Sequence, residues 1–302
     1  MPELPDIELY RHALAPRVVG QTIERVRLAS PFLVRSFDPP VSAIEGRSVV
    51  GLHRLGKRIV WELDDELFVV IHLMIAGRFR WKPRGTAVPG KVGLGAFDFA
   101  NGTLLLTEAS PKKRASLYVV RGRTALQAHD PGGLEVLTAT AAQFAERLRL
   151  QNHTVKRALT DPRLFSGIGN AYSDEILHAA QLSPLQWTSR LSEDDVARLF
   201  GATLQVLRTW TERLARETGD QFPEKVTAFR EGMAVHGRYG KPCPECGSTV
   251  QRIRYADNEC NYCATCQTGG KLLADRSLSR LLGADWPKTL DELEDIRLKA
   301  KG

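Results

Sequence analysis

The five cysteines of the chain all lie between residues 243 and 266, and their spacing restricts what this segment can fold into. Cys243-Pro-Glu-Cys246 and Cys263-Ala-Thr-Cys266 are two Cys-x-x-Cys turns, separated by sixteen residues. Two such turns bring four thiolates to a tetrahedral centre, the geometry that zinc takes in closed structural sites. Cysteines that form disulfides are usually spread along a secreted chain, so the clustering indicates metal binding in a reducing compartment. We predict a small hairpin that binds one structural Zn²⁺ ion through these four cysteines.

Cys260 offers an alternative pairing, because Cys260-Asn-Tyr-Cys263 is also a Cys-x-x-Cys sequence. We favour Cys263 and Cys266, since they leave a longer hairpin and Cys266 is followed by polar residues typical of a turn. The metal then only braces the hairpin, and we expect functional contacts at its tip, residues 257–259.

The composition is that of a soluble globular protein, with 43% hydrophobic and 25% charged residues among 302. This excludes a largely disordered or fibrous chain, and no run approaches the roughly 18 apolar residues of a membrane span. The acidic start Met1-Pro2-Glu3 is unlike a basic secretion leader. We therefore expect a cytoplasmic protein without membrane association.

The formal net charge of +7 is concentrated in the first part of the chain. Residues 1–130 hold 19 Lys and Arg against 13 Asp and Glu, whereas the charges of the remainder nearly cancel. A basic surplus gathered in one region favours a polyanionic partner such as nucleic acid.

Short strands dominate the sequence up to about residue 125. Before them, apolar residues at helical spacing predict a helix over 4–15, closed by Pro16 and Gly20. Asp64-Asp65 and Asn101-Gly102 indicate hairpins. The predicted strands cover residues 22–28, 58–63, 67–73, 96–100 and 103–107. Numerous short strands without intervening helices predict an antiparallel β-sandwich or barrel, so the fold class is multidomain α+β.

Asp130-Pro131-Gly132-Gly133 is the clearest break in the chain. Apolar residues recur at helical spacing from there to about residue 217, the cysteine segment follows, and a last short helix is expected over Leu290–Leu298. We predict four parts: an N-terminal helix and β-sandwich domain (1–130), a helical domain (131–233), the zinc hairpin (234–268) and an extension of unassigned role (269–302).

Within the helical part, Phe165-Ser-Gly-Ile-Gly-Asn170 separates two helical stretches. Its glycines allow a tight turn and expose backbone N–H groups beside the next helix, which is a suitable place for a phosphate. Asn170 could add a side-chain donor. The alternative is a plain turn between helices.

The amino terminus offers a nucleophile. Methionine before a small residue such as Pro2 is commonly removed, which would leave proline with a free secondary amine. An uncharged secondary amine attacks an aldehyde-level carbon to form an iminium, and Glu3 beside it could shuttle a proton. The alternative is structural, because proline and acids also begin a helix well.

Basic residues gather where loops between the predicted strands are expected: at Lys57, at Lys112-Lys113-Arg114, and at Arg78, Arg80, Lys82 and Arg84. Single basic residues often only face water. A concentration of them on one domain suits sequence-independent phosphate contacts.

Taken in order, these features resemble the formamidopyrimidine-DNA glycosylase/endonuclease VIII family of base-excision repair enzymes. The resemblance covers roughly residues 2–268 and rests on an ordered set of motifs. These are Pro2-Glu3-Leu4-Pro5-Asp6, Gly56-Lys57, His72-Leu73 with Ala76-Gly77, Gly167-Ile168-Gly169-Asn170-Ala171-Tyr172, Val235-His236-Gly237-Arg238 and the four cysteines.

The resemblance implies that Pro2 attacks C1′ of a damaged nucleotide, expels the base and forms a Schiff base that permits strand cleavage by β- and δ-elimination. Glu3 matches the catalytic acid/base, Lys57 a lysine that contacts phosphate and is needed for base removal, and Asn170 the phosphate-binding asparagine of a helix–two-turn–helix motif. The implied partner is double-stranded DNA with a damaged base or abasic site, its target nucleotide turned out of the stack. The enzyme is expected to be a monomer associated with a bacterial-type nucleoid.

Several positions depart from the family pattern. Asp6 stands where the family has glutamate, and we assign it a helper role in catalysis. Asn258 replaces a hairpin arginine and so loses a charge and a bidentate fork. Ile75 lies at the position of a wedge methionine, and Lys113 and Arg114 replace the Arg-Phe pair that probes the opposite strand. The segment 219–235 is shorter than the usual lesion-capping loop.

The sequence thus predicts a bifunctional DNA glycosylase/AP lyase with one structural zinc, acting through Pro2, Glu3, Asp6 and Lys57. Ile75, Lys113, Arg114, Asn170 and Asn258 are the predicted DNA contacts. An alternative is a protein that binds damaged or abasic DNA without excising bases, favoured by Asp6 and Asn258. A zinc-ribbon protein acting on RNA is a third interpretation.

Overall fold

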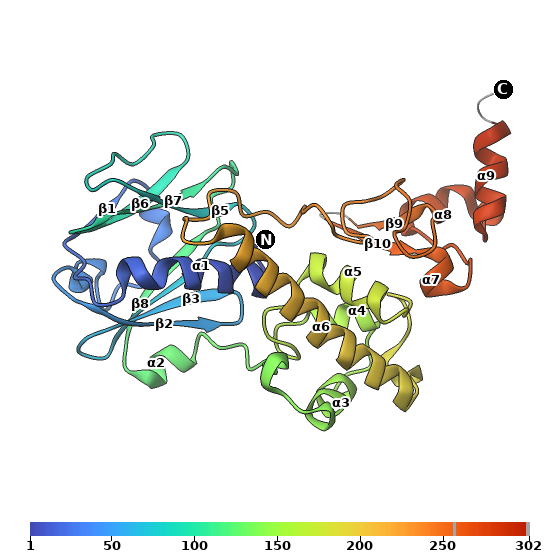
Figure 1. Cartoon of the computed structure of the whole chain (residues 1–302), viewed down its shortest axis with the longest axis horizontal. Helices are drawn as coiled ribbons and strands as arrows, with labels where there is room; N and C mark the ends of the chain where they lie inside the picture. Colours follow the sequence, from blue (N-terminus) through green and yellow to red (C-terminus); the bar gives the residue numbers. More distant parts are fainter. Residues whose placement is uncertain (256–257, 300–302) are drawn as a thin grey trace. The chain divides into compact units, whose positions relative to one another are not determined.

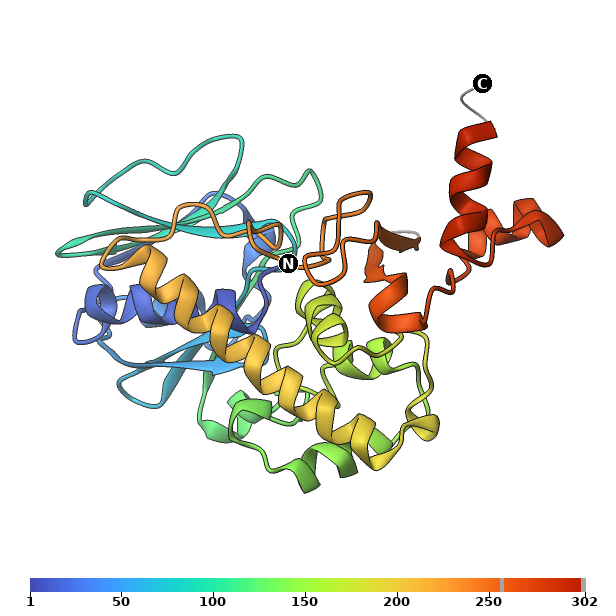
Figure 2. The ribbon, with the colours of Figure 1, turned by 45° about the vertical axis from the view of Figure 1, so that its right-hand side comes forward.

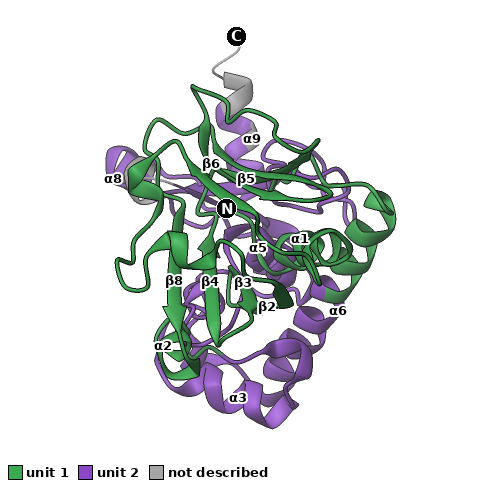
Figure 3. Cartoon of the chain, turned by 90° about the vertical axis from the view of Figure 1, so that its left-hand side faces the viewer, with its two compact units in different colours: residues 1–133, 208–228 green, residues 134–207, 229–302 purple. Residues whose placement is uncertain are grey.

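The computed structural model of the protein describes residues 1–255 and 258–299. Contacts divide the chain into two compact units, residues 1–133 with 208–228 and residues 134–207 with 229–302 (Figure 3). The division falls inside the long helix α6 (Glu193–Thr218). Residues 208–228 belong to unit 1 because Phe222 packs on Tyr10, with 6.1 Å between ring centroids, and the Val226 carbonyl accepts a bond from Arg78. The finer four-part division stays a prediction.

Unit 1 begins with helix α1 (Leu4–Val18), which lies against the first two strands of one sheet. The prediction that this helix ends before Pro16 is wrong, because Pro16 lies inside its last turn. Proline removes one backbone donor there, but the Val19 N–H still bonds the Ala15 carbonyl at 3.1 Å and completes the turn.

Two four-stranded antiparallel sheets follow, with strand orders β1-β6-β7-β5 and β2-β3-β4-β8, and they confirm the predicted β-sandwich (Figure 1). The strands are β1 (Arg25–Leu28), β2 (Val49–Leu55), β3 (Arg58–Leu63), β4 (Leu67–His72), β5 (Gly77–Lys82), β6 (Gly93–Phe99), β7 (Gly102–Glu108) and β8 (Ser116–Arg121). All residues of β6 and β7 are buried, as expected of central strands that carry side chains into the core.

Both predicted hairpins are present, β3 with β4 and β6 with β7, but the second turn is one residue earlier than predicted. Gly102 already pairs with Phe99, so the turn residues are Ala100 and Asn101. Glycine is required at position 102 for a steric reason, since a Cβ there would lie 2.5 Å from the Trp81 ring. Short helices complete the unit: η1 (Pro31–Leu33), η2 (Val41–Ile44) and α2 (Arg123–Gln127).

Unit 2 contains the helices expected after the Pro-Gly-Gly break. They are η3 (Val136–Thr138), α3 (Ala141–Arg149), α4 (Val155–Thr160), α5 (Asn170–Ala179), η4 (Thr188–Arg190) and the first part of α6. Helix α3 begins with a capping box between Thr140 and Gln143. The turn between α4 and α5 contains buried Phe165 and Ile168, so the glycine-rich segment packs into the core of this unit.

The cysteine segment forms the predicted hairpin, β9 (Val250–Arg254) with β10 (Glu259–Cys263), followed by α7 (Ala264–Thr268). The extension continues as α8 (Arg276–Leu282), η5 (Gly283–Asp285) and α9 (Leu290–Lys299), the red end of the chain in Figure 2. It packs on the hairpin, since the Leu273 N–H donates to the Tyr262 hydroxyl at 2.8 Å and the Arg254 N–H to buried Asp275 at 2.7 Å. Across all of the residues that the structure describes, no helix is both long enough and apolar enough to cross a bilayer.

Candidate active site and metal centre

Met1 is exposed, but the residues directly after it are packed into unit 1. Pro2 is buried, and the side chains of Glu3 and Asp6 are 3% and 0% exposed. The Glu3 N–H donates to Asp6 Oδ2 at 2.9 Å, so the Asp6 carboxylate caps the first turn of α1 and fixes the backbone beside Pro2. This contact makes Asp6 a residue that positions its neighbours; its predicted role as a catalytic helper stays a prediction.

The surroundings of the terminal amine favour its neutral form. Burial lowers the pKa of the Met1 amine, and the Arg78 and Lys57 cations lower it further, while the Glu3 and Asp6 carboxylates act in the opposite direction. A cationic ammonium loses hydration on burial, so the nitrogen keeps its lone pair at lower pH than an exposed amine does. A neutral amine is what nucleophilic attack requires.

Lys57 lies in the two-residue turn between β2 and β3, where Leu55 pairs with Arg58. It is half-buried, and burial lowers the pKa of its ammonium group, opposed by the Glu3 carboxylate. Within residues 1–255 and 258–299 the structure gives its Nζ neither a hydrogen bond nor an ion pair. The fold thus brings Lys57 close enough to Glu3 and to the terminal amine for the charges to affect one another, and its predicted phosphate contact stays a prediction.

His72 ends strand β4 directly opposite Arg58. Burial lowers its pKa to about 4, and the charges of Arg58 and Lys57 add to the effect. Its Nε2 atom is buried without a hydrogen-bond partner among the described residues. The sequence showed His72 only as part of a motif and gave no sign of this environment, which depends on the pairing of β4 with β3.

Ile75 lies at the tip of the turn between β4 and β5, and 58% of it is exposed. The turn is tight, since the Gly77 N–H bonds the Leu73 carbonyl at 2.8 Å and Met74 has a φ of +53°. A Cβ on Gly77 would lie 2.2 Å from the Leu73 oxygen, so only glycine fits there. The turn therefore presents an apolar side chain to solvent on a rigid support, the property that the predicted wedge needs.

Lys113 and Arg114 differ in their availability. Lys113 Nζ donates to the Glu108 carbonyl at 2.6 Å and to the Lys91 carbonyl at 3.2 Å, so it holds its own loop. The Arg114 side chain is exposed, and its backbone N–H bonds buried Glu108. Of the two predicted DNA contacts, Arg114 is the one that extends into solvent.

The basic cluster on β5 and the turn after it is partly neutralised. Arg80 and Lys82 both pair with Glu224, at 3.1 and 2.8 Å, and Arg84 pairs with Glu24 at 2.7 Å. Composition alone overstated the positive charge of this surface.

Asn170 is the first residue of α5, and its side-chain amide donates to the Glu259 carbonyl at 2.8 Å. It therefore connects the α4–α5 turn to strand β10 of the hairpin. Asn258 is exposed in the hairpin loop, which its carbonyl closes by accepting the Tyr255 N–H at 2.8 Å. Asp257, also expected at the tip, lies outside the described residues.

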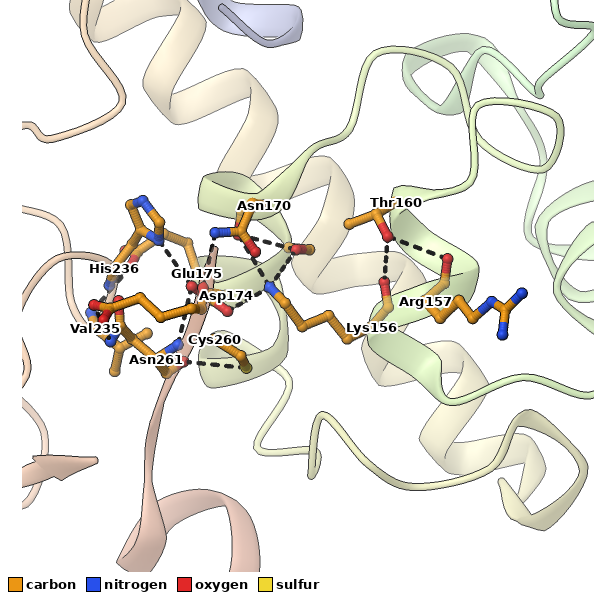
Figure 4. Close-up of polar contacts among 12 residues, drawn as sticks. Lys156, Arg157, Thr160, Asn170, Asp174, Glu175, Val235, His236, Cys260 and Asn261 are labelled. Carbon is orange, nitrogen blue, oxygen red and sulfur yellow. Dashed lines mark hydrogen bonds and ion pairs between the residues drawn. The ribbon is translucent and has the colours of Figure 1, made fainter. Parts of the chain in front are cut away.

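A buried charge network centred on Asp174 lies beneath Asn170 in unit 2 (Figure 4). One carboxylate oxygen of Asp174 accepts from Lys156 Nζ at 2.6 Å, and the other contacts His236 Nδ1 at 2.8 Å and the Asn261 N–H at 3.1 Å. Lys156 Nζ also bonds the Asn170 carbonyl at 3.1 Å. The network thus ties two helices to the segment before the hairpin and to β10.

The adjacent Glu175 connects α5 to the segment before the hairpin a second time. Its carboxylate accepts three successive backbone N–H groups, those of Ala234, Val235 and His236, at 2.7 to 2.9 Å. Glu175 is itself buried, and these three donors stabilise its carboxylate in place of water.

The four predicted cysteine ligands come together. The Sγ atoms of Cys243, Cys246, Cys263 and Cys266 all lie within 4.8 Å of one another. The distances from Cys246 to Cys263 and from Cys243 to Cys266 are 3.4 and 4.0 Å. A tetrahedral zinc with Zn–S bonds of about 2.3 Å requires about 3.8 Å between sulfurs, so the group fits such an ion. Cys260 is buried in a separate apolar cluster with Ile253 and Tyr262.

Comparison with known proteins agrees with this geometry. The family model for the formamidopyrimidine-DNA glycosylase N-terminal domain matches residues 1–168, and the model for the H2TH domain of the same enzymes matches residues 133–220. The chain belongs to the formamidopyrimidine-DNA glycosylase family. This is a family of DNA repair glycosylases that bind DNA.

Relatives in this family match half of the chain or most of it. The formamidopyrimidine-DNA glycosylase of Thermus thermophilus is 32% identical over 298 residues, which cover 89% of this chain and all of that protein. A formamidopyrimidine-DNA glycosylase-like protein of Mycobacterium tuberculosis is 41% identical over 150 residues, half of this chain and 93% of the relative.

Solved structures of the Lactococcus lactis glycosylase share the fold. A complex of the wild-type enzyme with DNA containing an oxidised pyrimidine has a TM-score of 0.77 and 26% identity, covering 88% of this chain and all of the other. A variant of that enzyme bound to DNA containing Fapy-dG gives the same values.

The buried network of Lys156, Asp174, Glu175 and His236 was not predicted from the sequence. A sequence signal existed for part of it. Lys156 and Asp174 both fall among apolar residues of amphipathic helices, at positions where an unpaired charge would be costly. The signal could not identify the partners, because they lie up to 87 residues apart, as Asp174 and Asn261 do.

Proposed function

We propose that the protein is a bifunctional DNA glycosylase/AP lyase of base-excision repair, which removes a damaged base through a Schiff base with Pro2. The observation that carries the proposal is the burial of Pro2 beside Glu3, at a chain end where the Arg78 and Lys57 cations lower the pKa of the terminal amine. Such an environment favours a neutral nitrogen, and the relatives that share the fold act on or bind damaged DNA.

Removal of Met1 leaves the Pro2 ring nitrogen as the terminal amine. Its lone pair forms a bond to C1′ of the damaged nucleotide while the bond from C1′ to the base breaks, and the base leaves with a proton. Loss of the C1′–O4′ bond then gives the iminium, with Glu3 placed to carry the proton that the sugar oxygen takes up. Proton loss from C2′ allows the 3′ phosphate to leave, which is the β-elimination step, and a second elimination releases the 5′ phosphate.

The remaining predicted residues bind the duplex in this proposal. Lys57 contacts a phosphate near the target sugar, Ile75 fills the vacated stack, and Arg114 contacts phosphate. Asn170 and Asn258 are further contacts from unit 2. Lys113 Nζ bonds two carbonyls that hold the loop of Arg114, and in this proposal it contributes less to DNA binding than Arg114 does.

Cys243, Cys246, Cys263 and Cys266 hold one Zn²⁺ ion, which braces the hairpin and takes no part in bond making. We further propose that the enzyme acts as a monomer in the cytoplasm, at the nucleoid. Light scattering of the purified protein with and without DNA tests the monomer.

Borohydride trapping on DNA with an abasic site tests the central step. Reduction of the iminium should give a covalent adduct, and proteolysis should place the adduct on the peptide that begins at Pro2. Intact mass should show that Met1 is absent. The Pro2→Gly variant should lose most of the adduct. An adduct on a lysine side chain, or a retained Met1 in protein that cleaves DNA, contradicts the proposal.

A non-excising damage-binding protein is the second candidate, favoured by Asn258 in place of a hairpin cation and by Asp6 acting as a helix cap. It predicts tight binding to abasic DNA with no adduct at any pH. Equal affinity for RNA and abasic DNA duplexes would instead support the RNA interpretation.

A further inference from the structure

His178 lies in the last turn of α5, next to the cysteine cluster and outside the predicted set of ligands. Its Nε2 atom is 3.2 Å from Cys243 Sγ, and the two residues are 5% and 3% exposed. A polar ring nitrogen in such a buried place needs a partner, and the sulfur is the partner that the structure supplies.

The direction of this hydrogen bond follows from the chemistry of the cluster. Four thiolates around Zn²⁺ carry a net charge of −2, and a thiolate has no proton to donate. The imidazole Nε2 must therefore carry the hydrogen, and the N–H donates to sulfur. Such a bond spreads the charge of a thiolate that water cannot reach.

The four thiolates differ in what stabilises their negative charge. Cys263 is fully buried, and its Sγ accepts the Cys266 N–H at 3.5 Å. Cys243 is the other buried ligand, and His178 supplies its donor. Cys246 is exposed and Cys266 half-exposed, so solvent can stabilise their charge. Each buried sulfur thus has an N–H donor, one from the backbone and one from His178.

The position of His178 on α5 adds a connection to the rest of unit 2. It follows Asp174 by four residues and Glu175 by three, so all three lie on one face of the helix. That face contacts the segment before the hairpin, strand β10 and the metal cluster, through Asp174, Glu175 and His178.

We propose that His178 is an outer-sphere residue of the metal centre, whose Nε2–H stabilises the Cys243 thiolate and fixes the metal-bound loop to α5. This rests on the proposed binding of zinc by the four cysteines. His178 is a positioning residue, and its role is retention of the metal and not bond making on DNA.

A pair of substitutions separates the hydrogen bond from the volume of the ring. His178→Gln keeps an N–H donor of similar reach, whereas His178→Phe keeps a ring and removes the donor. Outer-sphere partners of metal ligands typically contribute about 10–100-fold to metal affinity. We expect that factor to be lost in His178→Phe and largely retained in His178→Gln, measured as the rate of zinc transfer to an excess of a coloured chelator.

Cobalt substitution supplies a second readout. Full-length protein loaded with Co²⁺ should show the absorption of a four-thiolate site, and the thiolate-to-cobalt charge-transfer band should shift in His178→Phe but not in His178→Gln. If the phenylalanine variant does not fold, NMR of cadmium-substituted wild-type protein still tests the bond. The Hε2 proton of His178 should then show scalar coupling to the metal through sulfur.

Three results would overturn the inference. Unchanged zinc release and an unchanged cobalt spectrum in His178→Phe would show that the contact has no effect on the metal. A nitrogen ligand in the wild-type cobalt spectrum would make His178 an inner ligand. Protein that takes up neither zinc nor cobalt would overturn the metal assignment itself, whereas loss of borohydride trapping with normal metal binding would affect only the proposed catalytic function.

Discussion

Two lysines, one in each unit, are both removed from water at least in part, but only one of them has hydrogen-bond partners in the fold. Lys156 is 9% exposed, and its Nζ bonds the Asp174 carboxylate, the Ser173 hydroxyl and the Asn170 carbonyl. Lys57 is half-buried, and no described residue gives its Nζ a hydrogen bond. Burial lowers the pKa of Lys57, so its charged form is held at a cost to the fold.

The difference separates structural charges from groups placed for chemistry. A buried charge with a full set of hydrogen-bond partners stabilises one arrangement of the chain. A partly buried charge without such partners is typical of a group that binds a ligand or takes part in a reaction. Two histidines, one in each unit, show the same contrast. His236 in unit 2 contacts Asp174, whereas His72 in unit 1 has a buried Nε2 without a partner in the described chain.

The largest expected effect is the loss of stability on breaking the unit 2 network. Lys156→Met leaves Asp174 buried with one cation fewer, and removing one partner of a buried ion pair costs about 3–5 kcal/mol. We expect the free energy of unfolding to fall by that amount, measured by urea denaturation at neutral pH with tryptophan fluorescence.

The neighbouring Arg157 provides the control, because it lies on the same helix and is exposed. Arg157→Met should change the free energy of unfolding by less than about 0.5 kcal/mol. Equal losses in the two variants would show that the network is not the structural element that the contrast requires.

Lys57→Met should reduce base excision strongly and change the free energy of unfolding little, the opposite of Lys156→Met. In the proposed complex Lys57 holds a phosphate near the target sugar, so its loss misplaces the sugar and should lower turnover by about 100-fold, measured as base excision from a lesion-containing duplex. The free energy of unfolding should stay within about 1 kcal/mol of the wild-type value, because no partner is left unpaired. The exposed Lys91 serves as the control through Lys91→Met. A large loss of stability with unchanged excision would place Lys57 among the structural charges.

His72 makes the unpaired site sensitive to acid. Its pKa is about 4 in the fold and about 6.5 in the unfolded chain, so the unfolded state takes up a proton first as pH falls. Its contribution to stability is therefore fully present above about pH 6.5 and is lost as the pH falls towards 4, by about 2–3 kcal/mol. His72→Gln should reduce the loss of stability between about pH 7 and pH 4.5, while exposed His12→Gln should leave it unchanged. An identical pH dependence in wild type and His72→Gln would show that His72 is not desolvated.

Sequence-based prediction succeeded where the determinants are local. Strand β3 has the predicted ends, both predicted hairpins form, the second with its turn one residue earlier than predicted, and the two Cys-x-x-Cys turns bring four sulfurs together. The last helix was also expected within one residue of its end. In each case, the residues that decide the geometry are adjacent in the sequence or follow one periodicity.

It failed where the determinants are distant in sequence. Nothing in residues 208–228 indicated that they pack with α1 and β5, because that depends on Phe222 meeting Tyr10 and on the Val226 carbonyl meeting Arg78. The predicted basic clusters could not show which cations have acidic partners. The predicted site residues were individually visible, but whether each is paired or unpaired is a property of the fold.

The smallest expected effect concerns two adjacent residues of unit 1, Lys113 and Arg114. They repeat the contrast between a cation used by the fold and one left for a ligand, since Lys113 Nζ bonds two carbonyls of unit 1 and the Arg114 side chain is exposed. Removing one cation that neutralises a DNA phosphate makes the slope of log K against log salt shallower by about 0.9. Arg114→Ala should show this reduction in DNA binding measured across salt concentrations, and Lys113→Ala should leave the slope nearly unchanged while loosening the loop around Glu108. Equal reductions would mean that the carbonyl contacts of Lys113 yield to phosphate when DNA binds, and that pairing within the fold does not by itself remove a surface cation from the DNA contacts.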